Sequence, residues 1–208
     1  MIKKLLILIK IGRALAKSST LDYFEQLYKP NIFIRSCIKI FVFFSFRKKS
    51  LDSKSVGLRL VKALEELGPT FIKLGQFLGT RPDIVGKDLA IELQSLQDDL
   101  PPFAMSIAKQ SIIDEIGQEK FNEIKNLSEP IAAASIAQVH FADIDEKQFA
   151  IKILRPGIEK RFNDELEALM LFASIVESLL PKTRRLKLIE VVHLLKEITT
   201  IEMDLRFE

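Results

Sequence analysis

Apolar residues recur at helical spacing along most of this chain. A helix is expected from about residue 53, and Gly68-Pro69 should end it and begin the next, because glycine favours the end of a helix and proline its first position. Spacings of three and four residues predict its apolar face, which consists of Val56, Leu60, Leu64 and Leu67. The same pattern predicts further helices over residues 87–97, 104–116, 118–125, 158–180 and 188–207.

The spacing changes to the alternation of β-strands between residues 129 and 156. One strand is predicted over residues 135–141 and a second, almost wholly apolar one over residues 148–154, with a polar turn at residues 143–147. Lys152 is the one charged residue of the second predicted strand. Burying an unpaired ammonium group costs several kcal/mol, so an anionic partner is expected beside Lys152.

A strand lysine that follows a loop of small residues is typical of nucleotide-binding kinase folds. The segment Phe149-Ala150-Ile151-Lys152 has the form of the V-A-I-K strand, whose lysine holds nucleotide phosphates. The loop opens about 20 residues earlier and consists of Ala132, Ala133, Ala134 and Ser135. Because alanine lacks the access of glycine to positive φ, this loop should be stiff. The alternative is an ordinary β-hairpin whose lysine extends to solvent.

The first 50 residues combine basic and apolar positions. Residues 5–9 form an unbroken apolar stretch, and residues 37–46 form a second one that Lys39 interrupts. Both are too short to span a membrane, and no signal-peptide cleavage site is predicted. Segments of this kind either lie on an anionic membrane surface or dock on the rest of their own protein, and the sequence leaves both alternatives open.

Composition narrows the classes of function. The chain has 208 residues, of which 48% are hydrophobic, so a sizeable core is expected. A net charge of +3 gives no indication of nucleic-acid binding. Cys37 is the only cysteine, which excludes an internal disulfide and a cysteine zinc site. His140 and His193 are the only histidines, so no metal site is predicted and structural roles are expected for both.

The helix after Gly68-Pro69 carries a polar pair beside a glycine. Lys73 and Gln76 are three residues apart and should project together, while Gly75 would let another backbone or a ligand come close. The alternative is a surface lysine beside a glycine that serves packing alone.

The last predicted helix carries several acidic residues. At helical spacing Asp204 and Glu208 should share a face, where a cation would relieve their repulsion. Glu202 should point the other way and could pair with Arg206. The alternative is a solvated acidic end of the helix.

Several of these segments occur together in an order that is highly specific. They are LGPTFIKLGQ at residues 67–76, RPD at 81–83, LQD at 96–98, AAASIAQVH at 132–140, the lysine strand with Arg155-Pro156, and Glu202-x-Asp204. In this order they resemble the UbiB family of atypical kinase-like proteins, which is tied to ubiquinone biosynthesis. The resemblance extends from about residue 20 to the end of the chain.

The resemblance implies a nucleotide site. Lys152 would hold the phosphates, Glu208 would be its partner on helix C, and Ala132 to Ser135 would replace the glycine-rich loop of other kinases. ATP or ADP with Mg²⁺ is the implied cofactor.

It also implies a second group of residues that is particular to the family. Lys73 and Gln76 would belong to a helix that folds over the cleft where a protein kinase binds its peptide. Glu202 would be the partner of Lys73, and Asp204 would belong to the same acidic motif.

The sequence departs from the kinase pattern in one respect. It contains neither a catalytic-loop aspartate with its downstream asparagine nor an Asp-Phe-Gly motif, which supply the base and the magnesium ligands in kinases. No catalytic residue is therefore assigned, and the magnesium ligands are expected beyond residue 208.

These inferences combine into an expectation of α+β fold class. A basic apolar segment (residues 1–50) and a helical extension (51–126) should precede a kinase-like N-lobe with a small antiparallel sheet (127–208), without the C-lobe. The expected function is that of the N-terminal part of a UbiB-like kinase or ATPase that binds ATP and supports ubiquinone biosynthesis.

The expected location is peripheral, at the cytoplasmic face of a bacterial inner membrane or at an equivalent organellar membrane. The expected partners are adenine nucleotide, an anionic membrane surface and quinone-pathway proteins, with no nucleic acid. The alternative function is that of a non-catalytic, membrane-associated regulatory or scaffolding fragment.

Overall fold

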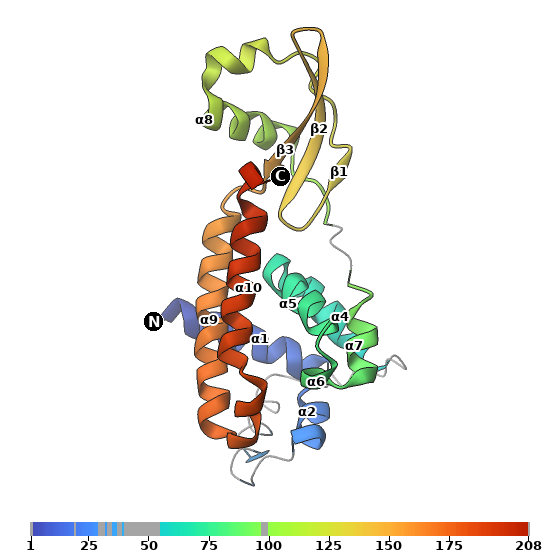
Figure 1. Cartoon of the computed structure of the whole chain (residues 1–208), viewed down its shortest axis with the longest axis vertical. Coiled ribbons are helices and arrows are strands. Elements are labelled where there is room, and N and C mark those ends of the chain that lie inside the picture. Colours follow the sequence, from blue (N-terminus) through green and yellow to red (C-terminus); the bar gives the residue numbers. More distant parts are fainter. Residues whose placement is uncertain are drawn as a thin grey trace. The chain divides into compact units, whose positions relative to one another are not determined.

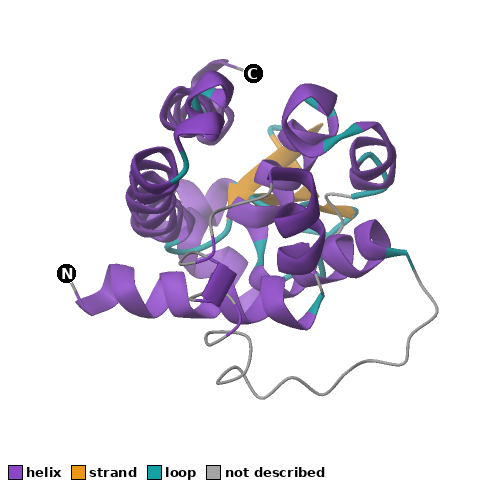
Figure 2. Ribbon diagram, turned by 90° about the horizontal axis from the view of Figure 1, so that it is seen from below, coloured by secondary structure: helices purple, strands orange, loops and turns teal. Residues whose placement is uncertain are grey.

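The computed structural model describes residues 2–18, 20–28, 32, 35–36, 39, 55–96 and 100–207. Helices account for most of the described chain, and three strands form one small sheet (Figures 1 and 2). The fold class is therefore α+β, as the sequence predicted. The chain forms two compact units, of which the first combines Met1–Gln97 with Phe162–Glu208 and the second is Asp98–Arg161. This division cuts across the three segments expected from the sequence, because the last two helices belong with the N-terminal ones.

The first unit is built from helices. Along the chain they are α1 (Ile2–Lys17), α2 (Thr20–Tyr28), α4 (Val56–Leu67), α5 (Pro69–Gly79), α6 (Pro82–Val85), α7 (Lys87–Leu93), α9 (Ile158–Leu179), η1 (Pro181–Leu186), α10 (Leu188–Met203) and η2 (Leu205–Phe207). The short helix α6 was not predicted from the sequence.

The junction of α4 and α5 follows the sequence prediction. Ser55 caps α4, because its hydroxyl accepts a hydrogen bond from the Leu58 amide at 3.2 Å. Gly68 ends α4 and also precedes α5, and its φ of 110° is a conformation that favours glycine. Pro69 then occupies the first position of α5.

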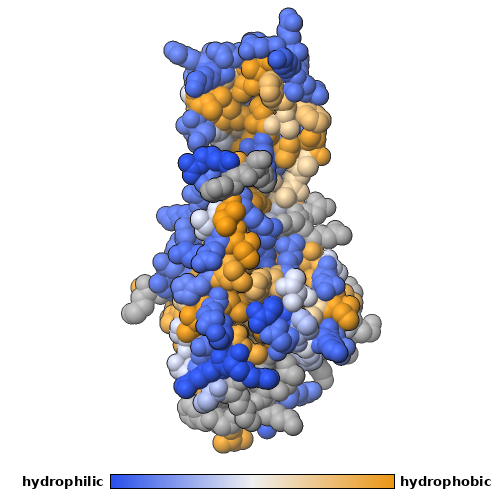
Figure 3. All heavy atoms as spheres, viewed as in Figure 1, coloured by the Kyte–Doolittle hydropathy of each residue, from blue (hydrophilic) through white to orange (hydrophobic). Residues whose placement is uncertain are grey.

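The core of the first unit gathers apolar residues from helices that are distant in sequence. Phe71, Ile72, Leu93 and Leu195 are almost completely buried. Helices α9 and α10 form a hairpin joined by η1 (Figure 1). Leu194, Ile198 and Ile201 of α10 are exposed at helical spacing. Figure 3 shows a strip of apolar surface over the region of this helix.

Helix α1 docks on the rest of its own unit. Ile11 and Ala16 are buried, and Lys3 and Lys4 pair with Asp164 and Glu167 of α9. For α1 this is the docking alternative of the sequence analysis. Among the residues that the structure describes, no helix has both the length and the apolar character needed to cross a membrane. The second apolar stretch, residues 37–46, lies outside the described residues except for Lys39.

The second unit combines the sheet with α8 (Met105–Glu123). Strands β1 (Ala132–Ala133), β2 (Ala137–Ile144) and β3 (Lys147–Leu154) are antiparallel in the order β1-β2-β3. The core forms where Ala108 and Ile112 of α8 meet Ile153 of β3. Gly117, with φ 83° and ψ 159°, divides α8 into two helical pieces, in agreement with the two short helices predicted there.

Three predicted boundaries were wrong. Strand β2 covers Ala137–Ile144 rather than residues 135–141, and only Asp145 and Glu146 are left for the turn. Both turn residues have positive φ, which is how a two-residue turn fits between twisted strands. Helix α7 ends at Leu93 rather than at residue 97.

The last helix also ends earlier than predicted. Helix α10 stops at Met203, because Asp204 has ψ of 89° and leaves the helical conformation. Arg206 pairs with Asp204 instead of Glu202, through two side-chain hydrogen bonds of 2.7 and 2.6 Å. Asp204 therefore lies beyond the helix on which it was expected to share a face with Glu208, and Glu208 itself lies outside the described residues.

Candidate functional site

Lys152 lies on the face of the sheet that α8 leaves uncovered. Side chains of a strand alternate between the two faces, so Ile151 and Ile153 project together and Lys152 projects the other way. Ile153 is buried and both isoleucines belong to the core that α8 completes. Lys152 is half-buried and lies opposite Val139 of β2. Strand β3 begins at Lys147 and therefore contains two charged residues. The prediction that Lys152 is the only one was wrong.

Part of the alanine-rich segment lies on the same face as Lys152. Ala132 pairs with Val139, which pairs in turn with Lys152, so these three residues form one row across the sheet. Ala132 and Ala133 form β1, which corrects the expectation that they belong to a loop. The loop itself begins at Ala134, whose amide donates to the carbonyl oxygen of Ala137 at 2.8 Å.

Ser135 is the polar residue of this loop, and it is fully buried. Its hydroxyl oxygen has no hydrogen-bond partner among the described residues. A buried hydroxyl without a partner is destabilising by about 1–3 kcal/mol, so the Ser135 hydroxyl is the unsatisfied polar group of this loop.

Arg155 fixes the loop, and the sequence reasoning gave it no role. Its guanidinium donates to the carbonyl oxygens of Ala134 at 3.0 Å, Leu100 at 3.2 Å and Pro101 at 2.9 Å. The group also lies 5.7 Å from the centre of the Phe103 ring. Desolvation by burial lowers the pKa of Arg155 from its ordinary value. The only sequence signal was the Arg155-Pro156 pair that follows the lysine strand.

His140 belongs to a buried network on the α8 side of the sheet. The Ser128 carbonyl oxygen can only accept, so His140 Nδ1 donates to it, at 2.8 Å. His140 Nε2 then accepts from the Gln138 amide at 2.8 Å. Gln138 also accepts from the Phe103 amide at 2.8 Å. These bonds tie β2 to the segments around it, which agrees with the structural role expected for His140.

The polar residues of α5 contact different partners. Lys73 Nζ lies 3.2 Å from Glu202 Oε1 and 3.2 Å from Glu202 Oε2 near the end of α10. The Gln76 amide instead donates to the Leu96 carbonyl oxygen at 3.3 Å. Gly75 serves packing, because a side chain there would overlap Leu64 and Leu96.

A second polar contact joins α5 to α9. Thr70 is fully buried, and its hydroxyl donates to Glu165, which is also buried. Thr70 and Lys73 are three residues apart and so lie close together on α5. One side of α5 therefore contacts an acidic residue near the start of α9 and another near the end of α10.

The Asp204 carboxylate is already bound by the neighbouring Arg206. The hydrogen bonds from Arg206 hold the pKa of the Asp204 carboxyl group below its ordinary value. Among the described residues, no three His, Cys, Asp or Glu side chains lie close enough together to hold a metal ion. The expected pair of Lys152 and Glu208 stays a prediction, since Glu208 is not described.

The sheet, its lysine and the acidic motif also occur together in a known protein family. The model of the ABC1 atypical kinase-like domain matches residues 95–208, which include the whole sheet, Lys152 and the Glu202-x-Asp204 motif. The chain belongs to the ABC1 atypical kinase-like family. The match begins after α5, so the family model itself does not cover Lys73 and Gln76.

Full-length relatives extend the likeness of this ABC1-type chain to its helical part. Three of them carry the name "Probable protein kinase UbiB". The protein of Vibrio atlanticus is 37% identical over 88% of this chain, that of Cellvibrio japonicus 34% identical over 97%, and that of Azotobacter vinelandii 39% identical over 76%. These matches cover 33%, 36% and 30% of the three relatives, so the ABC1-type chain spans about a third of their length.

Proposed function

We propose that this chain supplies the nucleotide-binding part of a UbiB-type atypical kinase. Lys152 would contact the phosphates of ATP or ADP, and the loop of Ala134 and Ser135, which continues from Ala132 and Ala133 of β1, would lie over them. The observation that supports this most is the row of Ala132, Val139 and Lys152 on the sheet face opposite α8. On that face Phe141 and Ala150 are exposed beside the row that contains Lys152.

The loop chemistry fits a phosphate ligand. Backbone amides and a lysine are the groups that kinase folds offer to phosphates. The buried Ser135 hydroxyl adds a donor without a partner among the described residues. The proposal assigns no magnesium ligand to the described residues. Mg²⁺ would arrive with the nucleotide and neutralise phosphate charge there.

We propose a gating role for the polar residues of α5. The pair of Lys73 and Glu202 would hold α5 against α10, as the UbiB resemblance implies for a helix that folds over the cleft. Gln76 of the same helix, through its bond to the Leu96 carbonyl oxygen, and Asp204 directly after α10 would belong to this gating group. The biological role that follows from the resemblance is the support of ubiquinone biosynthesis.

The nucleotide proposal is tested by titrating ADP into the isotopically labelled chain and following backbone amide shifts. We expect saturable shifts over residues 131–156. Lys152→Ala should raise the Kd at least about tenfold, because it removes the phosphate cation. Lys147→Ala, an exposed lysine of the same strand, is the matched control and should leave the Kd unchanged. Equal affinities for the chain and for Lys152→Ala would remove Lys152 from the site.

We also propose that the exposed side of α1 contacts an anionic membrane surface while its buried side stays docked on its own unit. Ile2, Leu5 and Leu6 lie on one side of α1 at helical spacing, and all three are well exposed. The same helix also carries three exposed basic residues, Lys10, Arg13 and Lys17, so basic groups accompany its apolar side. Apolar side chains beside basic ones are the usual features of a helix that lies at a lipid surface.

Co-sedimentation with liposomes tests this contact. We expect binding that requires acidic lipid and that weakens as salt rises, since exposed charges are screened over about 8 Å at physiological ionic strength. Replacing Leu5 and Leu6 by serine should reduce binding, while the same change at Leu194 and Ile198 of α10 is the control. Binding that ignores lipid charge and salt would contradict the proposal.

A further inference from the structure

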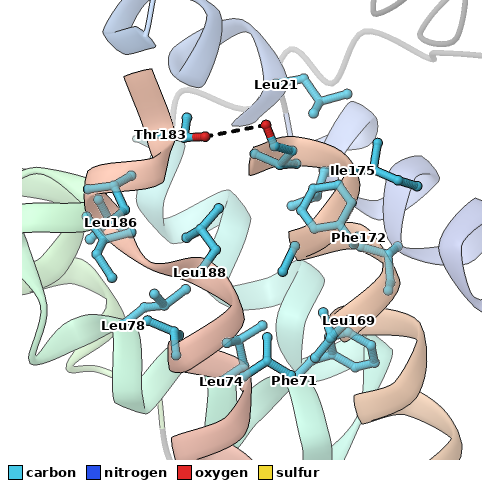
Figure 4. A pocket seen from close by; sticks show the side chains of 18 of the residues that line it. Leu21, Phe71, Leu74, Leu78, Leu169, Phe172, Ile175, Thr183, Leu186 and Leu188 are labelled. Atoms are coloured by element: carbon cyan, nitrogen blue, oxygen red, sulfur yellow. Dashed lines mark hydrogen bonds between the residues drawn. The ribbon is translucent and has the colours of Figure 1, made fainter. Parts of the chain in front are cut away.

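The first unit contains a large apolar cavity. Its volume is about 390 Å³, and it lies between the α9–η1–α10 hairpin and helices α1, α2, α4, α5 and α6 (Figure 4). Figure 4 shows Phe71, Leu74 and Leu78 of α5 facing Leu169 and Phe172 of α9 across it. The cavity is partly open, and a hollow of this size is unusual, because protein interiors contain few spaces larger than a water molecule.

The described wall offers almost no polar group to an occupant. Glu25 and Thr183 are the only polar residues among the described ones that line it. Glu25 already accepts a hydrogen bond from Arg35 at 2.6 Å, and the Thr183 hydroxyl donates to the Leu180 carbonyl oxygen at 2.7 Å. Buried water needs two to four polar partners, so this wall does not favour water or a polar ligand.

The hairpin is held at one end, and the cavity extends towards the other. The polar contacts of Glu165 and Glu202 with α5 lie at the start of α9 and the end of α10. Residues of η1 and the adjoining helix ends, including Leu180, Thr183 and Leu186, line the cavity. The hairpin can therefore enclose an apolar guest near its turn while its polar contacts stay in place.

We propose that this cavity binds a single hydrocarbon chain of a lipid. Liquid water occupies about 30 Å³ per molecule, so the cavity has room for roughly a dozen atoms of that size. A peptide helix, about 10 Å or more across, would already fill roughly this volume with a single turn of about 5.4 Å. A fatty acyl chain and an isoprenoid chain share the required chemistry. The proposal is independent of the nucleotide site, because no lining residue belongs to the second unit.

The test is a titration of the full chain with 1-dodecanol and, separately, with farnesol, followed by the methyl signals of Ile, Leu and Val. We expect saturable shifts at Leu74, Leu78 and Val192, which line the cavity. Saturation with dodecanol alone supports an acyl chain, saturation with farnesol alone supports an isoprenoid chain, and saturation with both supports the class.

Filling the cavity should remove binding without unfolding the chain. Ala173→Phe and Val176→Phe, both in the wall, should weaken binding at least about tenfold. Their melting temperatures should stay close to that of the unchanged chain, because the new ring enters empty space. Ala168→Phe, fully buried on the same helix but not in the wall, should lower the melting temperature by overpacking.

Leu171→Phe is the binding control, since Leu171 is exposed on α9 and is outside the described wall. It should bind both probes as the unchanged chain does. The proposal is overturned if neither probe saturates the wall signals, or if Ala173→Phe and Val176→Phe bind as tightly as Leu171→Phe. It is likewise overturned if both wall variants melt as low as Ala168→Phe, because the cavity would then not be empty space.

Discussion

At the scale of single residues, Arg155 does more for the candidate site than its place in the sequence indicates. It connects the alanine-rich loop to the carbonyl oxygens of Leu100 and Pro101. These bonds hold the loop in one conformation before any ligand arrives. The guanidinium group of Arg155 therefore adds to the backbone bond between Ala134 and Ala137 in holding the loop.

We expect Arg155→Met to destabilise the second unit by about 2 kcal/mol, because part-buried carbonyl oxygens would lose a charged donor. Arg155→Lys should recover only part of this loss, since an ammonium group cannot reproduce the planar fork of arginine. Denaturant unfolding measures both changes, with Lys120→Met on the exposed side of α8 as the control. A loss no larger than that of the control would show that the three bonds do not stabilise the loop.

Some residues of the candidate site could be predicted from the sequence, and others could not. Lys152 could be found because one lysine in an apolar strand is a local signal. The Lys73 and Glu202 contact came from the family resemblance, since 129 positions separate the two residues and no spacing rule relates them. The role of Arg155 depends on carbonyl oxygens more than 50 positions away, so no local pattern contained it.

At the scale of elements, α5 stands out because polar contacts join it to both helices of the α9–α10 hairpin. Lys73 is only 15% exposed and Glu202 36% exposed, so solvent screens their attraction less than it does at the surface. Thr70 and Glu165 form the second contact. Loss of either contact should loosen the hairpin.

A double-mutant cycle tests the first contact. Lys73→Glu and Glu202→Lys should each lower the free energy of unfolding, and the double reversal should restore part of it, with a coupling of roughly 0.5–3 kcal/mol. The matched control is the pair of Lys187 and Glu190, whose side chains are 65% and 67% exposed. Its coupling should be below about 0.5 kcal/mol. Simple addition of the two losses at Lys73 and Glu202 would mean that the pair contributes nothing.

Periodicity predicted the existence of most elements and missed some of their ends. The boundary of α4 and α5 was predictable because Gly68-Pro69 is a direct signal for it. The end of α10 was not predictable in this way. Asp204 is outside the helix and accepts hydrogen bonds from Arg206, two residues later. Such a local polar bond competes with the helix without changing the apolar spacing.

At the scale of the whole molecule, we expect that the 208-residue chain alone does not turn over ATP. Phosphoryl transfer depends on positioned metal ions and a positioned nucleophile, and the sequence contains no Asp-Phe-Gly motif to hold the metal. The measurement is Mg²⁺-dependent phosphate release by the purified chain. Lys152→Ala is the control for a contaminating activity. Release that disappears with this substitution would show that the chain contains a complete catalytic centre.

The order of the chain through its two units has a consequence for folding during synthesis. The second unit is continuous from Asp98 to Arg161, whereas the first needs residues from both sides of it. As the chain leaves the ribosome, the sheet and α8 can therefore close before the first unit does. Thr70 and Lys73 are synthesised before their partners Glu165 and Glu202. The contacts of the N-terminal helices with α9 and α10 therefore form last. Until then the side of α5 that carries Thr70 and Lys73 lacks both of its partners, although α4 and α7 can already pack on the helix.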